Sequence, residues 1–252
     1  MTKIIVVASG KGGTGKTSLV AGVSAALASA GKKVLVIDGD SGLRNLDIVL
    51  GMSDRVVFSF ADVASGMVTL DEAAVKHPAL EHLYLLTAPA DPMKNELTSD
   101  QIRTLVRQIR EEKFRYVLID GPAGLAPEYT AFAAAADEAI VVTTGENGSL
   151  RGAERMARLL EDQQVRTVRL AVNRISNRMV KRGGAVTVDD AMDATGLCLL
   201  GVIPEDPSVS ICAAEGKPIV TSQQSGAAGA YTNIARRLTG ENVPLMRIPY
   251  YF

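Results

Sequence analysis

The chain has 252 residues, 47% of them hydrophobic and 22% charged, and its 27 basic and 28 acidic side chains leave a formal net charge of −1. The apolar content excludes an intrinsically disordered chain, and the balanced charge argues against a polybasic nucleic-acid-binding arm as the main function. Two cysteines and two histidines are too few for a disulfide framework or a histidine-rich metal site. No apolar run reaches the roughly 18 residues that suggest a membrane span, so we expect a cytoplasmic globular protein.

Short, continuously apolar runs alternate with longer amphipathic runs along the chain. Continuous apolar runs are typical of strands that are buried on both faces of a parallel sheet, and they occur at residues 3–8, 33–38, 83–87, 115–120, 138–143, 167–172 and 197–202. Apolar positions at helical spacing predict helices at residues 17–30, 98–112, 149–162 and 227–239. The alternation predicts a layered α/β sheet with right-handed crossovers, in one domain over residues 1–240, followed by an apolar tail over residues 241–252.

The strongest motif lies between the first predicted strand and the first predicted helix, at residues 10–17. It matches the phosphate-binding pattern G-x-x-x-x-G-K-[ST] in full and in the expected context. Glycines allow successive N–H groups to turn inward around phosphate oxygens, and the next helix adds the positive end of its dipole. The motif predicts a three-layer P-loop NTPase fold, with a mostly parallel central sheet flanked by helices on both faces. The predicted nucleotide-binding residues here are Gly10, Lys11, Gly12, Gly13, Thr14, Gly15, Lys16, Thr17 and Ser18.

Two residues of this loop have predicted roles at the phosphates. Lys16 is expected to bridge the β- and γ-phosphates, and the hydroxyl of Thr17 is expected to bind Mg²⁺. The same residues also contain the weaker dinucleotide-binding pattern G-x-G-x-x-G, with Asp38 at the place of a ribose-binding acid. That alternative, a Rossmann oxidoreductase, gives no role to Lys16, to Thr17 or to a second strand-end acid at Asp120. A polyphosphate also explains why two lysines share one glycine-rich turn, since they repel each other unless an anion lies between them.

Three aspartates end or follow predicted strands. Asp38 ends the second strand, Asp40 follows two residues later, and Asp120 ends the strand at 115–120. Because ligands bind at the carboxyl ends of strands in open α/β sheets, these carboxylates are expected to face the phosphate loop. Asp120 is predicted to hold Mg²⁺ through a bound water, with Asp38 in a similar role, and Asp40 is predicted to orient the attacking water. An ordinary turn aspartate remains the alternative for Asp40.

Residues 11–17, with the additional lysine Lys11, resemble the deviant Walker A motif of the ParA/MinD family of P-loop ATPases. Further stretches resemble the MinD branch of that family, the septum-site ATPases of bacterial division, at residues 42–47, 120–124, 179–183 and 201–206. The resemblance covers residues 3–240. It implies an ATPase that converts ATP and water to ADP and phosphate with Mg²⁺, and that regulates division-site placement.

The resemblance also implies a homodimer in the ATP state, in which Lys11 of one subunit reaches the phosphates bound by the other. It matches Asn173 to an adenine-reading asparagine, and it matches Pro204 and Asp206 to the loop around the base. It further implies division-regulator proteins as partners, with part of the helix at 149–162 in the contact surface. DNA is not an expected partner, given the nearly neutral total charge.

Several alternatives stay open at this point. A ParA-like partitioning ATPase, or a flagellar or pilus-positioning ATPase, would use the same chemistry for a different cargo. A metabolic P-loop ligase, such as a biotin-pathway synthetase, would need a small-molecule co-substrate. Four basic residues at helix-compatible spacing form either a solvated face or an interaction patch: Arg174, Arg178, Lys181 and Arg182.

The last residues depart from the family pattern, which usually ends in a basic amphipathic helix. Pro244 and Pro249 exclude a continuous helix, and Arg247 is the one charged residue among residues 243–252. The apolar side chains of this tail can insert into lipid, pack on the body or bind a partner, so peripheral attachment to the cytoplasmic face of the membrane stays an alternative.

The two cysteines have apolar neighbours in the sequence. Cys198 and Cys212 are therefore expected to be small buried residues.

Overall fold

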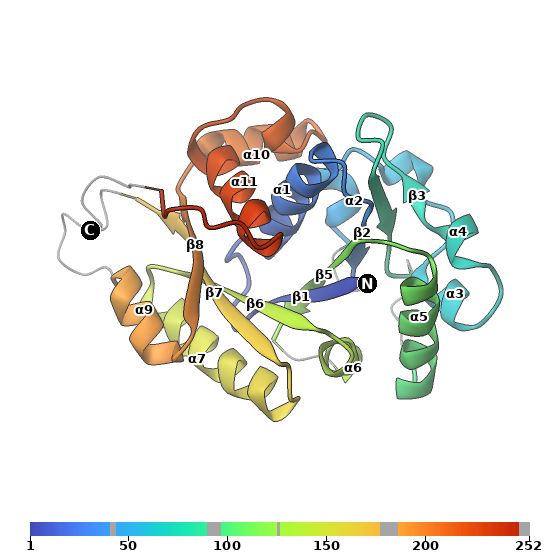
Figure 1. Ribbon diagram of the computed structural model, residues 1–252, viewed down its shortest axis with the longest axis horizontal. Coiled ribbons are helices and arrows are strands. Elements are labelled where there is room, and N and C mark those ends of the chain that lie inside the picture. Colours follow the sequence, from blue (N-terminus) through green and yellow to red (C-terminus); the bar gives the residue numbers. More distant parts are fainter. Residues whose placement is uncertain (41–43, 90–96, 125–126, 177–185, 247–252) are drawn as a thin grey trace.

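The computed structural model describes residues 1–40, 44–89, 97–124, 127–176 and 186–246, which form one sheet between two layers of helices (Figure 1). The strand order is β3-β4-β2-β5-β1-β6-β7-β8. The strands span Lys3–Ser9 (β1), Val34–Asp38 (β2), Val75–Lys76 (β3), Leu83–Leu86 (β4), Tyr116–Ala123 (β5), Glu138–Thr144 (β6), Thr167–Ile175 (β7) and Cys198–Pro204 (β8). All neighbouring pairs are parallel except β3 and β4, so the prediction of a mostly parallel α/β sheet is confirmed.

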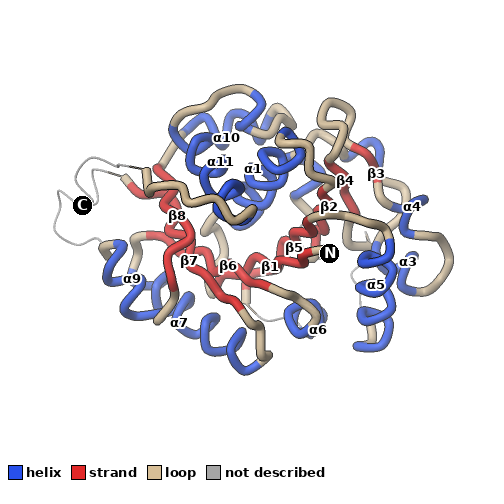
Figure 2. The backbone as a smooth tube through the Cα atoms, viewed as in Figure 1, coloured by secondary structure: helices blue, strands red, loops and turns tan. Residues whose placement is uncertain are grey.

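Helices cover both faces of the sheet (Figures 1 and 2). One face packs against α1 (Lys16–Ser29), α2 (Leu46–Val49), α10 (Pro207–Ala214) and α11 (Gly226–Leu238). The other face packs against α3 (Phe60–Ala64), α4 (Leu70–Ala73), α5 (Ser99–Glu111), α6 (Pro127–Ala134), α7 (Asn147–Asp162) and α9 (Val188–Thr195). In the described part of the chain, 3₁₀ turns span Ser53–Arg55 and Ile219–Thr221. The four predicted helices correspond to α1, α5, α7 and α11.

Strand β1 shows why the predicted strands are apolar without alternation. All five residues at 4–8 are fully buried. Ile4 and Val6 belong to the core on the α5 and α7 side, whereas Ile5 and Val7 belong to the core beneath α1 and α11. Burial of one such side chain contributes about 1.5–3 kcal/mol. Both faces of the strand are therefore stabilised by apolar packing, which holds the loop after β1 in a fixed place.

Helix α1 is buried on more sides than its sequence pattern predicts, because α11 packs along it. Beyond the predicted apolar face, small residues of α1 are buried too, namely Ala21, Gly22, Ser24, Ala25 and Ala28. A side chain at Gly22 would place its Cβ only 2.3 Å from the ring of Tyr231 on α11. The helix that begins at the phosphate loop is therefore packed closely between the sheet and α11.

Strand β3 and the short helices other than α6 were not predicted, because two to eight residues carry too little periodicity; for α6, the small residues at 131–136 predict a helix face for close packing. Helix α10 has local signals that identify its start. The carboxylate of Asp206 accepts a hydrogen bond from the N–H of Ser208 at 2.9 Å, and Pro207 occupies the first helical position. An aspartate N-cap followed by proline is a common helix beginning.

The expectation that both cysteines are buried is wrong. Cys198 is exposed and Cys212 is half-buried. Cys198 is the first residue of β8, which is an edge strand of the sheet. Cys212 lies on α10, and none of that helix's residues is fully buried. Apolar neighbours in the sequence do not bury a residue when its element lies at the margin of the fold.

Residues 241–246 of the tail pack on the body. The Arg237 guanidinium donates hydrogen bonds to the carbonyl oxygens of Leu200 at 2.9 Å, Val243 at 3.0 Å and Pro244 at 2.8 Å. Val243 is buried, and Met246 packs against the core beneath α11. The remaining tail residues, 247–252, lie outside the described part of the chain. No helix within that described part is long and apolar enough to cross a membrane.

His77 provides a testable pH dependence of stability. Its Nδ1 accepts hydrogen bonds from the N–H groups of Ala79 at 3.1 Å and Leu80 at 3.0 Å, and burial lowers its pKa from the ordinary value of 6.5. The unfolded chain therefore takes up the proton first as the pH falls below about 6.5, and the free energy of unfolding decreases there. His77→Asn, which keeps an acceptor oxygen without titrating, should lose less stability than the wild type between pH 7.5 and 5.5. Urea denaturation at both pH values measures this, and an equal loss in both proteins would contradict it.

Candidate functional site

The loop between β1 and α1 has the backbone shape that its glycines predict. Gly13 and Gly15 have φ values of +77° and +91°, in the left-handed region that favours glycine. A Cβ on Gly10 would lie 2.1 Å from the carbonyl oxygen of Gly152, so Gly10 and helix α7 touch backbone to backbone. Gly152 interrupts a helical sequence, but here it allows α7 to approach the phosphate loop.

Lys16 lies at the floor of this loop. Its side chain is almost fully buried, and its Nζ donates to the Oγ of Ser9 at 3.0 Å. Burial lowers the pKa of Lys16, while the nearby carboxylates of Asp120 and Asp40 raise it. Ser9 was not predicted as a site residue. Its Oγ also donates to the carbonyl oxygen of Lys11 at 2.8 Å, so it connects both loop lysines.

Asp120 and Thr17 form a pair beside Lys16. The Thr17 hydroxyl donates to Asp120 Oδ2 at 2.6 Å, whereas Asp120 Oδ1 is buried and has no hydrogen-bond partner among the described residues. Burial raises the pKa of Asp120 to about 7. An unpartnered carboxylate oxygen beside a hydroxyl is a donor set that Mg²⁺ prefers, and Mg²⁺ needs few protein ligands because it keeps waters and phosphate oxygens. The residues present therefore fit the predicted ion.

Asp38 lies opposite Asp120 in the register of β2 and β5, as predicted, but its oxygens are already in use. Oδ1 accepts from the N–H of Asp40 at 3.1 Å, and Oδ2 accepts from the N–H of Leu46 at 3.0 Å. Burial raises the pKa of Asp38 to about 6 despite these two bonds. Asp38 thus anchors both ends of residues 40–46, a segment of which residues 41–43 lie outside the described chain. The half-buried Asp40 is near enough to raise the pKa of Lys16.

A second group of predicted residues surrounds a cavity of about 590 Å³, here called the base cavity, which Gly15 and Ser18 line at the loop side. Asn173 and Pro204 also line it. The Asn173 amide donates from Nδ2 to the carbonyl oxygen of Thr14 at 2.8 Å. Asp206 accepts at Oδ2 from the N–H of Ala227 at 3.1 Å and from Gln223 at 3.2 Å.

These bonds give two of the predicted base residues structural partners. Asn173 joins the end of β7 to the phosphate loop, and Asp206 joins the beginnings of α10 and α11. The structure therefore brings Asn173, Pro204 and Asp206 around one cavity next to the loop, as the sequence predicted. Their contacts with a base stay predictions.

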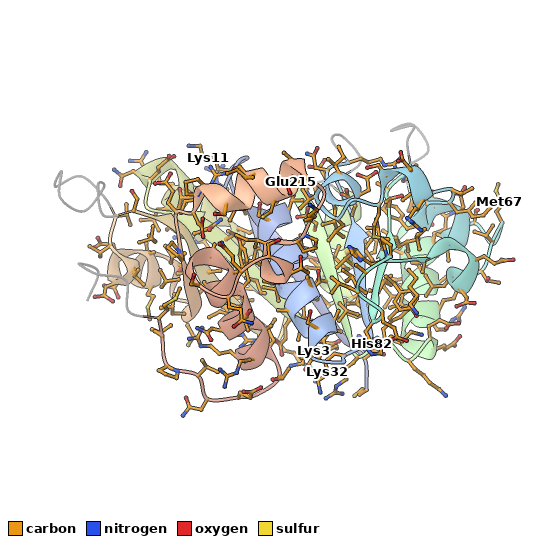
Figure 3. All side chains as sticks on the ribbon, turned by 90° about the horizontal axis from the view of Figure 1, so that it is seen from above. Lys3, Lys11, Lys32, Met67, His82 and Glu215 are labelled. Atoms are coloured by element: carbon orange, nitrogen blue, oxygen red, sulfur yellow. The ribbon has the colours of Figure 1, made fainter. Side chains whose placement is uncertain are left out.

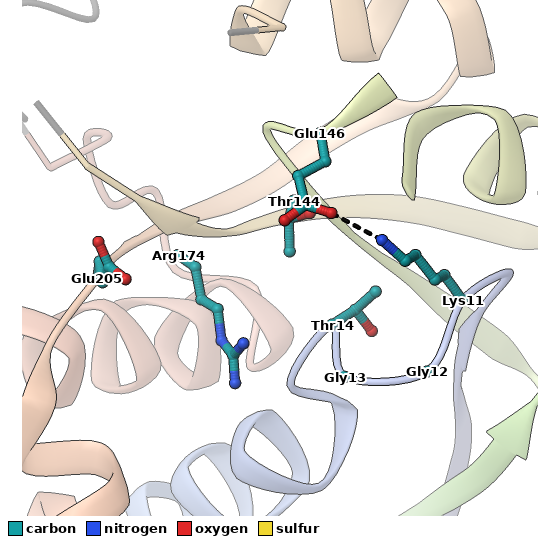
Figure 4. Close-up of a pocket in the computed structure, with 8 residues that line it drawn as sticks. All are labelled: Lys11, Gly12, Gly13, Thr14, Thr144, Glu146, Arg174 and Glu205. Atoms are coloured by element: carbon teal, nitrogen blue, oxygen red, sulfur yellow. Dashed lines mark hydrogen bonds and ion pairs between the residues drawn. The ribbon is translucent and has the colours of Figure 1, made fainter. Parts of the chain in front are cut away.

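Lys11 lies at the rim of the loop rather than at its floor, and it lines the same cavity as Gly12, Gly13 and Thr14. Its Nζ pairs with Glu146 Oε2 at 2.8 Å, and the two side chains are 51% and 56% exposed (Figure 4). Glu146, which precedes α7, was not predicted, and nothing in its local sequence marks it. Figure 3 places Lys11 on the edge of the sheet opposite Lys3 and Lys32, which is the edge where the parallel strands end.

The predicted basic cluster is divided by the structure. Arg174 lies at the nucleotide site, where it lines the base cavity. Arg178, Lys181 and Arg182 fall within residues 177–185, outside the described residues. Residues 42–43 and 179–183, which belong to the stretches that carry the family resemblance, also lie outside the described residues.

Comparison with known proteins agrees with this site. A family model described as "ParA: NUBPL iron-transfer P-loop NTPase" matches residues 1–239. The septum site-determining protein MinD of Synechocystis sp. is 41% identical over 247 residues, which cover 98% of this chain and 92% of the relative. A chain of the MinC:MinD cell division protein complex of Aquifex aeolicus has 39% identity and a TM-score of 0.90, with 97% of this chain and 98% of that chain covered. MinD complexed with Mg-ADP from Pyrococcus horikoshii has 32% identity and a TM-score of 0.84, with 94% and 96% covered.

These similarities decide between the alternatives. A partitioning ATPase, a metabolic ligase and an oxidoreductase are not favoured, because the relatives with high identity and nearly full coverage are septum site-determining proteins. The description of the matching family model also names iron transfer. The two cysteines of this chain lie on separate elements, β8 and α10. The chain belongs to the MinD family of septum site-determining proteins within the ParA group of P-loop ATPases: it hydrolyses ATP with Mg²⁺ and regulates the placement of the division site.

Proposed function

We propose that the chain is a switch that forms a homodimer when it binds ATP and separates after hydrolysis. The observation that carries this proposal is the position of Lys11, whose exposed side chain pairs with Glu146 at the rim of the loop while Lys16 occupies the floor. Because its side chain is about half exposed, this cation is available to the γ-phosphate held by a second copy. A positive side chain supplied in trans neutralises charge that develops on the transferred phosphoryl group.

Each residue of the site has a role in hydrolysis under this proposal. Lys16 and the loop N–H groups hold the β- and γ-phosphates, and Asp40 orients a water molecule toward the γ-phosphorus. The water oxygen bonds to phosphorus while the bond to the β–γ bridging oxygen breaks, and the water proton leaves with the phosphate. Thr17 and Asp120 would hold Mg²⁺, with Asp38 in support, and the ion neutralises charge on the phosphate oxygens when it is bound. Asp38 keeps the segment that carries Asp40 in place through its two backbone hydrogen bonds.

Partner proteins and the membrane are further parts of the proposal. One similar structure is a complex named for MinC and MinD, which supports a division-regulator protein as a partner of this chain. Helix α7 is the surface we propose for such a partner, because its Gly152 touches Gly10 of the phosphate loop and Glu146, just before it, holds Lys11. For the membrane, we propose peripheral attachment through the apolar residues at the end of the tail.

Size-exclusion chromatography tests the switch. The chain is run with ADP, then with ATP and Mg²⁺, and then with liposomes added. The proposal expects a monomer with ADP and a dimer with ATP and Mg²⁺; a monomer in both states refutes it. Co-elution of the dimer with liposomes that is lost when residues 243–252 are removed supports the tail as an anchor, and unchanged binding excludes it.

Glu146→Gln should make dimer formation easier. The exposed Lys11–Glu146 pair holds the lysine toward its own α7, and exposed ion pairs contribute about 0.2–1 kcal/mol. Removing the charge should therefore lower the ATP concentration for half-maximal dimer formation by up to about fivefold, with a nearly unchanged melting temperature. Glu215→Gln, which removes an exposed acid paired with Lys217 instead, is the control. A weaker dimer in Glu146→Gln would contradict the role of the pair.

A further inference from the structure

Arg174 has an unusual backbone conformation for its place in the fold. It lies within β7 with a φ of +56°, where the pairing of β7 with β8 shifts register between Val172 and Ile175. Lys113 and Gln164 also have positive φ, but both come just after helix ends, where the left-handed conformation is common. An arginine in this conformation inside a strand is strained, and such strain and such bulges concentrate at functional sites.

The bulge directs the Arg174 side chain into the nucleotide site. Arg174 lines the base cavity and also a cavity of about 330 Å³ over the loop, here called the phosphate cavity. Glu205 is the other residue that lines both. The charge of Arg174 acts on groups at both sides. Lys11 is the main cause of the lowered pKa of Glu146 beside the phosphate cavity, and Arg174 adds to that lowering. Burial raises the pKa of Tyr231 beside the base cavity, and Arg174 opposes that rise.

The guanidinium of Arg174 is free of hydrogen bonds and ion pairs to any other described residue. Within the part of the chain that the structure describes, no side chain or carbonyl accepts a hydrogen bond or an ion pair from it. Two acids flank the cavities, yet Figure 4 shows the guanidinium pointing away from both Glu146 and Glu205. An unpaired, always-charged group over a glycine-rich loop is suited to binding an anion.

We propose that Arg174 binds the α-phosphate of the nucleotide, an assignment that rests on the proposed nucleotide switch. The loop residues Gly13 and Thr14 line the phosphate cavity, and Pro204 and Asp206 line the base cavity. Arg174 lines both, so it lies between the phosphate side and the base side of the site. The α-phosphate is the anionic group at that junction, and Gly15 and Ser18 line the cavity beside it.

The α-phosphate is common to all nucleotides, and this makes the assignment testable. Affinities for Mg-ADP are measured by calorimetry and those for Mg-GDP by competition. Arg174→Ala should weaken both by the same factor, about tenfold to hundredfold, because charge-assisted hydrogen bonds are lost. The difference from wild type should shrink at high salt, and Arg174→Lys should recover part of the affinity. Arg166→Ala, which removes an exposed arginine just before β7, should bind like the wild type.

Arg174→Gly separates binding from folding. Glycine adopts positive φ without strain, so this variant should melt about 2–4 °C higher than the wild type while it loses as much affinity as Arg174→Ala. A loss confined to adenine nucleotides would overturn the α-phosphate assignment, and so would unchanged affinity in Arg174→Ala when the wild type binds normally. If the wild type itself binds neither nucleotide, the proposed function fails rather than the role of Arg174.

Discussion

Replacing Lys16 by alanine is expected to abolish ATP-dependent dimer formation and hydrolysis. Lys16 is buried at the floor of the loop, where it donates to Ser9 and lies near Asp120 and Asp40. Burial lowers the pKa of Lys16, which means that removing the charged ammonium group from water costs free energy in the folded protein. A polyphosphate compensates that cost, so losing the lysine removes the main cationic contact of the β- and γ-phosphates.

Light scattering with ATP and Mg²⁺ measures the effect of Lys16→Ala. The wild type is expected as a dimer and the variant as a monomer at every ATP concentration used. Lys76→Ala, which removes an exposed lysine on the edge strand β3, is the matched control and should dimerise normally. A dimer of unchanged size in Lys16→Ala would count against the whole account of the loop.

Replacing Asp40 by alanine should separate binding from hydrolysis. Asp40 is half-buried near Lys16, and Asp38 holds its N–H, so its carboxylate can orient water without carrying the nucleotide. Loss of a group that positions or polarises the attacking water reduces the rate by about 10²–10⁴-fold. ATP affinity and ATP-dependent dimer formation should remain, and the dimer should persist longer because hydrolysis no longer reopens it.

Phosphate release and dimer lifetime together test Asp40. Asp54→Ala, which removes an exposed acid on the 3₁₀ turn at Ser53–Arg55, should release phosphate at the wild-type rate. Normal phosphate release in Asp40→Ala refutes the role proposed for this residue. It would leave Asp40 as the ordinary turn aspartate that its sequence also permits.

The sequence predicted those parts of the site that depend on neighbouring residues. The phosphate loop is a local structure, because its glycines, its lysine and the start of α1 lie within nine residues, 10–18, and the structure has the expected turn. Asp38 and Asp120 were found because strands of one parallel sheet end at the same edge, which is a general property of such sheets. The strands themselves were recognisable because both faces of the sheet are covered.

Other parts depend on contacts between distant segments, and no local pattern reports them. Glu146 holds Lys11 from 135 residues away, and Gly152 fits Gly10 only because α7 crosses the loop. Asp38 was predicted to support the metal, yet the fold also uses both its oxygens to hold residues 40–46. Arg174 looked like one of four surface charges until the β7 bulge turned it toward the nucleotide site.

The sequence alone determines the chemistry of the loop, the class of fold and the acids at the strand ends. These features follow from residue type and spacing over short segments. Tertiary structure alone decides the strand order, the exposure of Cys198, the partner of Lys11 and the direction of Arg174. The physical reason is the same in each case. Burial, ion pairing and backbone strain depend on which distant segments come into contact, and in this chain that is settled when the helices pack on the two faces of the sheet.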